Sequence, residues 1–193
     1  VIVEKNIPAQ AITVTNPITG ETIGTIPAQT AEEVRAAVER ARAAQPAWSA
    51  LGVRARAALI DRWRRELWAD QAAFIKLIRE ETGKTEGGAF TEIAVTDLIA
   101  QFYVREAPRR LTPQTRKPAY PVIHRTKVFF KPYGVVGFIT PWNYPLLNGV
   151  GDIVSALVAG NAAVLKPSEV TPFSAIRAIE LMHTCGIPAD VVQ

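Results

Sequence analysis

The sequence predicts an α/β protein in which the first half of a Rossmann-like parallel sheet follows an N-terminal hairpin and a layer of helices. Three observations lead to this class. From residue 134 onward, apolar segments alternate between strand-like and helix-like patterns, as they do in consecutive βαβ units. Residues 132–193 carry six charged side chains in 62 positions, which suits elements that are buried on both faces. The region before residue 108 shows helical periodicity instead.

Composition narrows the possible classes further. Of the 193 residues, 48% are apolar and 21% are charged, which is typical of a globular protein and excludes a disordered chain. Because Cys185 is the single cysteine, an intrachain disulfide and a thiolate zinc site are excluded as well. The nearly uncharged stretch 153–165 is too short to span a bilayer, so we expect no membrane partner. The first five residues lack the features of a secretory signal, and we therefore expect a cytoplasmic protein.

The N-terminal part is expected to form a hairpin and four helices. Two β-branched runs, 11–15 and 21–26, flank a turn with Asn, Pro and Gly, which predicts an antiparallel hairpin. Thr30 and Glu33 have the spacing of a capping box. The helices are expected at 31–45 (ending before Pro46), at 53–69, from an Asp70 cap to Gly83, and at 88–105. Five arginines of the second helix lie largely off its apolar stripe and are expected on a solvated face: Arg54, Arg56, Arg62, Arg64 and Arg65.

A proline-rich segment separates the helices from the sheet. Helix formation is expected to stop at its prolines, which are Pro108, Pro113, Pro118 and Pro121. Residues 122–131 then alternate loosely, which predicts an extended β arm over 114–132. The strand edges of such an arm need a partner, and a neighbouring subunit is one candidate. The chain therefore divides into three parts: 1–113 (hairpin and helices), 114–132 (arm) and 133–193 (first half of the sheet).

The last part reads as strand, helix, strand, helix and strand. The expected segments are 134–140, 148–158, 162–165, 172–184 and a third strand that starts at 190–192. A doubly wound sheet does not normally stop at its third strand. We therefore expect this sequence to be the front part of a larger protein.

Polar side chains follow the first two of these strands. In open α/β sheets, ligands bind outside the carboxyl ends of the strands, which here are 138–145 and 164–172. Lys166 and Glu169 could together bind a polyhydroxyl ligand, since a carboxylate accepts from hydroxyls and an ammonium donates. The same pair could equally form a local ion pair that caps the following helix. No Gly-x-Gly-x-x-Gly follows the first strand, so the usual dinucleotide fingerprint is absent.

These two segments closely resemble the aldehyde dehydrogenase superfamily. The matching stretches are Gly137-Phe138-Ile139-Thr140-Pro141-Trp142-Asn143-Tyr144-Pro145, Ala159-Gly160-Asn161 and Val164-Leu165-Lys166-Pro167-Ser168-Glu169-Val170-Thr171-Pro172. Upstream, 16–21 is similar to the opening hairpin turn of that family, and 81–84 to a helix-ending turn. The resemblance covers essentially the whole chain in order, and the family binds its dinucleotide without the glycine fingerprint.

The resemblance implies an oxidoreductase that oxidises an aldehyde substrate to a carboxylic acid with NAD or NADP. A cysteine thiolate attacks the aldehyde, hydride passes to the cofactor, and a glutamate activates water to hydrolyse the thioester. Asn143 matches the oxyanion-hole asparagine, which is the catalytic residue expected here. The expected cofactor-binding residues are Ile139, Thr140, Trp142, Lys166, Ser168 and Glu169, with Lys166 and Glu169 on the adenosine ribose. The 114–132 arm resembles the oligomerisation strand of the family, which implies a homo-oligomer, either a dimer or a tetramer.

The nucleophilic cysteine and the general-base glutamate of the family lie beyond residue 193, so the catalytic domain is absent and this portion alone is expected to be inactive. The alternative is a non-catalytic nucleotide-binding or subunit-interaction fragment. A carboxylate at Glu169 favours NAD because it would repel the 2′-phosphate of NADP, although NADP stays possible through Ser168 and Lys166. Cys185 is expected to be an ordinary half-buried thiol. No metal site and no nucleic-acid partner are expected, because the histidines lack further ligands and the basic residues lack stacking aromatics.

Overall fold

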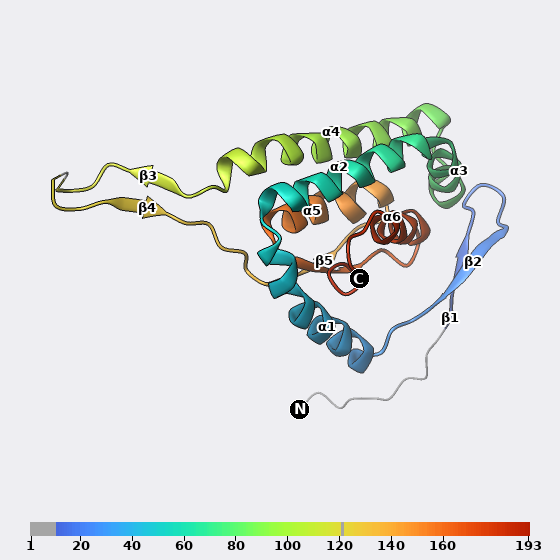
Figure 1. Ribbon diagram of the computed structural model, residues 1–193. Helices are drawn as coiled ribbons and strands as arrows, with labels where there is room; N and C mark the ends of the chain where they lie inside the picture. The colour runs from blue at the N-terminus through green and yellow to red at the C-terminus, as the bar shows by residue number, and fades with distance from the viewer. Residues whose placement is uncertain (1–10, 121) are drawn as a thin grey trace.

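The computed structural model describes residues 11–120 and 122–193, and shows a mixed α/β protein (Figure 1). Helices pack over a small parallel strand pair, and a two-stranded arm projects to one side of this body. Residues 1–10, which include the five considered for a secretory signal, and Pro121 of the predicted arm lie outside the described residues. The strands are β1 (Ala11–Thr15), β2 (Thr22–Pro27), β3 (Gln114–Arg116), β4 (Thr126–Val128), β5 (Val135–Ile139) and β6 (Ala162–Lys166). The helices are α1 (Ala31–Ala50), α2 (Val53–Ala69), α3 (Gln71–Thr82), α4 (Glu86–Arg110), α5 (Pro145–Ala159) and α6 (Phe173–Thr184).

The predicted hairpin and capping box are confirmed. Strands β1 and β2 pair antiparallel, and Asn16 Oδ1 accepts the backbone N–H groups of Ile18 and Thr19 in the turn. Thr30 Oγ1 accepts from the backbone N of Glu33 at 3.2 Å, and the Glu33 carboxylate accepts from the backbone N of Thr30 at 2.7 Å. Two of the N–H groups at the start of α1 are thereby satisfied locally.

Two prolines that were expected to end helices lie inside them. Helix α1 continues through Pro46 to residue 50, and α4 continues through Pro108 to residue 110. In α1, Trp48 is fully buried beyond the proline and its indole N–H donates to the carbonyl of Leu157 at 3.0 Å. Ala107, beside the second proline, also belongs to the core. Burial of residues around each proline offsets the backbone hydrogen bond that the proline removes.

The prediction that the Asp70 side chain caps the third helix is wrong. The residue does separate α2 from α3, but its side chain makes no capping bond and instead accepts from Arg177 Nη2 at 2.6 Å. The C-terminal prediction is confirmed, because Gly83 ends α3 in the left-handed region with φ 73°. Glycine has no Cβ and tolerates this conformation without strain.

The prediction that the arginines of α2 lie on a solvated face is also wrong in part. Arg56 is buried, and its guanidinium donates to the carbonyls of Val158 (3.1 Å) and Ser49 (2.6 Å). Arg64 is half-buried between Asp61 and Asp97, at 2.9 and 2.8 Å. These arginines tie α2 to α1, α4 and α5, whereas Arg54, Arg62 and Arg65 are exposed as expected.

The core lies where α2, α4 and α5 pack side by side above the parallel strands (Figure 1). Trp63 on α2 is fully buried and donates its indole N–H to the carbonyl of Ala178 on α6 at 3.0 Å. Helices α5 and α6 approach closely at Gly149, where a Cβ would stand 2.7 Å from the Cβ of Ala175. No helix in the described part of the chain is both long and apolar enough to cross a membrane.

The parallel pairing expected for the last part is present. Strands β5 and β6 pair in parallel from Val135 opposite Ala162 to Ile139 opposite Lys166. The third segment reaches β6 on its other side, since Ala163 N donates to Val191 O at 2.8 Å and Leu165 N donates to Gln193 O at 2.7 Å. The connection β5–α5–β6 is therefore a βαβ crossover, and the predicted third strand is present only as an isolated parallel bridge between Ala163 and Val192.

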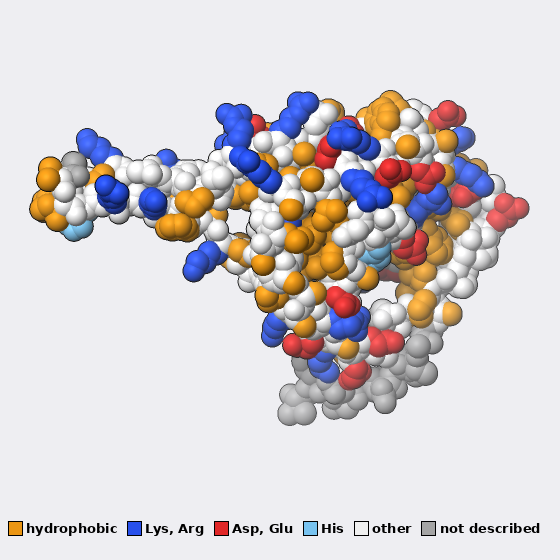
Figure 2. All heavy atoms as spheres, in the orientation of Figure 1, with side chains coloured by type: hydrophobic (Ala, Val, Ile, Leu, Met, Phe, Trp, Pro, Cys, Tyr) orange, Lys and Arg blue, Asp and Glu red, His pale blue; other side chains and the backbone are white. Residues whose placement is uncertain are grey.

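The expected extended arm is present as an antiparallel ribbon of β3 and β4. It stands clear of the body, and Figure 2 shows apolar and basic side chains along its surface. Its large apolar residues are exposed in the chain, among them Val122, Ile123, Phe129 and Phe130. Its two strands pair with each other and with no other described strand, and an isolated two-stranded ribbon is only marginally stable.

Candidate active site

The carboxyl ends of β5 and β6 lie next to each other and are joined by two hydrogen bonds. Thr140 N donates to the carbonyl of Lys166 at 3.2 Å, which extends the strand pairing into the first turn. The hydroxyl of Thr171 donates to the carbonyl of Trp142 at 3.2 Å, which ties the second turn back to the first. The two turns that follow these strands therefore form one continuous edge.

The start of α5 is held by a buried carboxylate from another helix. Glu92 on α4 accepts the backbone N–H groups of Leu146 and Leu147 on one carboxylate oxygen, at 2.8 and 3.1 Å. Its other oxygen accepts from Lys84 Nζ at 2.9 Å. Pro145 occupies the first helical position and has no N–H. The helix end at which a glycine fingerprint would place a pyrophosphate is thus already occupied by a carboxylate of the chain.

Asn143 lies in the turn just before α5, and its side chain is exposed. Its Oδ1 accepts from Asn148 Nδ2 at 3.3 Å. No described residue accepts a hydrogen bond from Asn143 Nδ2. The neighbouring Tyr144 ring lies under Lys84, with Nζ 3.8 Å from the ring centroid. Asn143 thus presents an uncommitted amide donor on a turn that is anchored at both ends.

Lys166 and Glu169 form an exposed ion pair at the second turn. Nζ lies 2.9 Å from Glu169 Oε2 and 3.1 Å from the carbonyl of Pro167, and the two side chains are 61% and 60% exposed. The hydrogen bond from Lys166 lowers the pKa of the Glu169 carboxyl, which keeps it ionised. Exposed pairs of this kind contribute little to stability.

This ion pair does not cap the following helix. Helix α6 begins at Phe173, and its first N–H groups are bound by the buried carboxylate of Glu81. Glu81 also accepts from the hydroxyl of Ser174. The capping interpretation of Lys166 and Glu169 is therefore wrong, and the two side chains stay directed toward solvent at the sheet edge.

The other candidate residues differ in how they are presented. Ile139 and Trp142 are exposed, at 84% and 59%, beside the same edge. Thr140 is half-buried. Ser168 is 7% exposed and its hydroxyl oxygen accepts from the backbone N of Val170 at 3.3 Å, so it shapes the turn.

Sequence reasoning missed Glu81 and Glu92 as determinants of this edge. Burial raises the pKa of Glu81, against the opposing effect of the hydrogen bonds from Ser174 and Phe173. A signal for it existed in the sequence, because Phe74, Ile78 and Glu81 share the buried face of α3. An acidic residue on a buried helical face needs donors, and here they come from the start of another helix.

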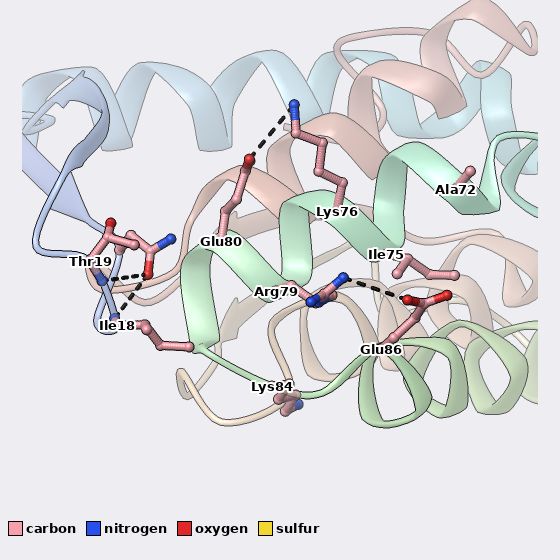
Figure 3. A pocket seen from close by; sticks show the side chains of 10 residues that line it. Ile18, Thr19, Ala72, Ile75, Lys76, Arg79, Glu80, Lys84 and Glu86 are labelled. Atoms are coloured by element: carbon pink, nitrogen blue, oxygen red, sulfur yellow. Dashed lines mark hydrogen bonds and ion pairs between the residues drawn. The ribbon is translucent and has the colours of Figure 1, made fainter.

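A cavity of about 460 Å³ lies beside this region, between the β1–β2 turn and the helices α3 and α4 (Figure 3). Four of its five charged side chains are paired with one another. Lys76 lies 3.7 Å from Glu80, and Arg79 lies 3.6 Å from Glu86. Figure 3 shows Lys84 at its margin, and the Nζ of that residue is bound to Glu92.

Cys185 and the histidines have ordinary structural surroundings. Cys185 is buried after α6, and burial raises the pKa of its thiol. His183 makes a hydrogen bond of 2.9 Å to the carbonyl of Val192, and His124 lies against the ring of Tyr120 on the arm. Cys185 was expected to be half-buried, whereas it is almost fully buried, at 1% exposure.

Comparisons with known proteins agree with this arrangement. A glutarate-semialdehyde dehydrogenase from Pseudomonas putida is 40% identical over 184 residues, which cover 95% of this chain and 38% of the relative. A solved E. coli NADP-dependent enzyme superposes with a TM-score of 0.90 at 36% identity, over 95% of this chain and 38% of that one. An NAD-dependent benzaldehyde dehydrogenase from Corynebacterium glutamicum superposes with a TM-score of 0.87 at 29% identity, over 95% and 40%.

This chain spans well under half the length of each of these relatives. One of these solved enzymes is NADP-dependent and the other is NAD-dependent, so both cofactors occur among similar proteins. The model of the aldehyde dehydrogenase family matches residues 3–193. With the fold, the two joined turns and this match in agreement, the chain belongs to the aldehyde dehydrogenase family.

Proposed function

We propose that this chain is the N-terminal, cofactor-binding part of an NAD(P)-dependent enzyme that oxidises an aldehyde to a carboxylic acid. The observation that carries the proposal is the Thr140–Lys166 hydrogen bond, which joins the Asn143 turn to the Lys166–Glu169 turn at one edge. Ligands of open α/β sheets bind at this edge. In this account 133–193 is the first half of a Rossmann-like sheet, and 1–113 supplies the hairpin and helices of the same domain.

Asn143 acts on the substrate oxygen. When a thiolate adds to the aldehyde carbon, the carbon–oxygen π electrons move onto oxygen, which becomes negative. The Nδ2 of Asn143 donates to that oxygen, and a preorganised donor of this kind is worth about 10²–10³ in rate. In the family, a catalytic domain supplies the thiolate. It also supplies the glutamate that activates water to hydrolyse the thioester, which forms only after hydride has left the tetrahedral adduct. The bound cofactor supplies the hydride acceptor.

Lys166 and Glu169 bind the adenosine ribose of the cofactor. Their side chains are exposed, are not used to cap α6, and contribute little to stability, so ligand binding accounts for this use of charge. The ionised Glu169 accepts from the ribose hydroxyls and repels a 2′-phosphate, which favours NAD over NADP. Ile139, Thr140 and Trp142 line the path of the cofactor, and Ser168 contributes to its binding by fixing the second turn.

The β3–β4 arm mediates assembly into a homo-oligomer. Its strands pair only with each other among the described residues, and its apolar side chains are exposed. An unpaired ribbon edge with exposed aromatic residues is covered when a second copy packs against it. The assembled full-length enzyme is expected in the cytoplasm.

The test is kinetic and uses the full-length enzyme. A panel of acetaldehyde, benzaldehyde and succinic semialdehyde first identifies a substrate that is oxidised. Asn143→Ala is then expected to lower kcat/KM for that aldehyde by about 10²–10³-fold. The dissociation constant of NAD, measured by fluorescence titration, should stay within about twofold. Equal losses of turnover and of NAD affinity would show that Asn143 supports the fold and does not stabilise the oxyanion.

A further inference from the structure

Asn143 is not alone at the start of α5. It precedes the N-cap residue Tyr144, and Asn148 occupies the fourth position of the helix. Helix geometry brings these two positions together across the first turn, where a pair of apolar side chains often packs. Here both positions carry asparagine, and Asn148 Nδ2 donates to Asn143 Oδ1 at 3.3 Å.

We propose that Asn148 is a positioning residue, which holds the Asn143 amide in the one orientation that presents Nδ2 to the substrate. This inference rests on the proposed function of Asn143. A primary amide carries its acceptor and its donor on opposite sides of one bond. A donor from Asn148 on Oδ1 turns the Nδ2 group of Asn143 away from the helix.

The first turn of α5, which carries Asn148, is held in place by hydrogen bonds of its backbone. The backbone N of Asn148 donates to the carbonyl of Tyr144 at 2.8 Å, which closes the first turn of the helix. The two N–H groups before it are bound to the buried carboxylate of Glu92. Asn148 is half-buried and therefore has little freedom to leave Asn143. Because Asn148 is fixed in this way, it can hold the Nδ2 of Asn143 within the small positional range in which a catalytic donor is effective.

Helix stability does not explain an asparagine at this position. Asparagine has a lower helix propensity than leucine or methionine, and the neighbouring side chains of α5, Leu146, Leu147 and Val150, are apolar. The only hydrogen bond that a described residue makes with the Asn148 side chain is the one to Asn143. The side chain is therefore accounted for by its contact with Asn143.

Two substitutions of Asn148 in the full-length enzyme test whether this residue orients the Asn143 amide or only packs against it. Asn148→Leu keeps the size of the side chain and removes the donor, so the Asn143 amide can rotate. We expect kcat/KM for the aldehyde to fall about 3- to 10-fold, as for the loss of one hydrogen bond. Asn148→Asp offers only acceptors, which attract Nδ2 and turn the amide the wrong way. For this variant we expect a larger loss, about 30- to 100-fold.

Asp152→Asn is the matched control, because it changes a charge on the exposed face of the same helix, one turn further on. It should leave kcat/KM within about twofold. In Asn148→Leu the dissociation constant of NAD should be unchanged and the melting temperature should not fall, since the loss of a structural role would lower the melting temperature. In the Asn143→Ala background, Asn148→Asp should lower kcat/KM by less than about twofold, because the group that it misdirects is gone.

The outcomes distinguish the two proposals. If Asn143→Ala keeps its activity, the proposed function of Asn143 fails and this inference fails with it. If Asn143→Ala loses activity but both Asn148 variants match the wild type, only the positioning role fails. The positioning role is also overturned if Asn148→Asp lowers kcat/KM equally with and without Asn143, or if NAD affinity falls in parallel with turnover.

Discussion

The carboxylate of Glu92 on α4 accepts a hydrogen bond at 2.8 Å from the backbone N–H of Leu146 on α5. Glu81 on α3 binds the start of α6 in the same manner. Neither helix has a side-chain cap of its own. The helical layer thus fixes the starting points of both crossover helices, and with them the two turns that carry Asn143 and Glu169.

Removal of the Glu92 carboxylate is expected to be costly for stability. In Glu92→Ala the N–H groups of Leu146 and Leu147 and the ammonium of Lys84 lose their partner in a buried place. We expect the free energy of unfolding to fall by about 3–5 kcal/mol, as for other broken buried pairs. Denaturation in guanidinium chloride measures it. Glu39→Ala, which removes an exposed pair with Arg42, is the control and should change it by less than about 0.5 kcal/mol. Similar losses in both variants would contradict the capping role.

The cofactor preference is expected to depend on Glu169. Glu169→Gln removes the negative charge and keeps the size, so the repulsion of a 2′-phosphate disappears. The KM for NADP divided by the KM for NAD should fall by about tenfold. The melting temperature should stay the same, because the ion pair is exposed. Glu180→Gln on the exposed side of α6 serves as the control. An unchanged ratio would argue against a ribose contact by Glu169.

The two arginines Arg54 and Arg56 provide a matched pair on α2. Arg56 is buried and donates to the carbonyls that end α1 and α5, whereas Arg54 is exposed. Arg56→Ala leaves the Val158 carbonyl without a donor, removes one donor from the Ser49 carbonyl, and should lower the free energy of unfolding by about 2–4 kcal/mol. Arg54→Ala should change it by less than about 0.5 kcal/mol. Chemical denaturation measures the free energy of unfolding of both variants, and equal losses would refute the role given to Arg56.

Cys185 should be slow to react at neutral pH. Burial raises the pKa of its thiol above the ordinary value of 9.0, and only the thiolate is alkylated. The folded protein therefore holds this proton to higher pH than the unfolded protein does. Alkylation of the Cys185 peptide by iodoacetamide, followed by mass spectrometry, should stay low at pH 8 and rise only above about pH 9, whereas the unfolded protein should react at pH 8. Rapid modification of the folded protein at pH 8 would contradict this environment.

Local patterns in the sequence predicted local structure well. The capping box of Thr30 and Glu33, the glycine at position 83 and the alternation after residue 134 each depend on neighbours along the chain. Pro46 and Pro108 were misjudged because the helices continue around buried residues whose partners are distant in sequence. Burial of that kind overrides a local preference.

The site was predictable to the same extent. The turns after β5 and β6 could be placed at one sheet edge because parallel strands share their carboxyl ends. The roles of Glu81 and Glu92 could not be assigned from the sequence, because their hydrogen-bond partners lie 93 and 54 residues further along the chain. The Asn148–Asn143 bond spans only five residues, but it depends on where α5 begins, and the sequence placed that start three residues too late.

The most direct measurement is a crystal structure of the full-length enzyme with NAD bound. It should show the adenosine ribose hydroxyls within hydrogen-bonding distance of Lys166 Nζ and of the Glu169 carboxylate. The nicotinamide end should lie on the Asn143 side of the same edge, with Asn143 Nδ2 facing the substrate cavity. A ribose bound away from both Lys166 and Glu169, or Nδ2 of Asn143 turned back onto α5, would contradict the account.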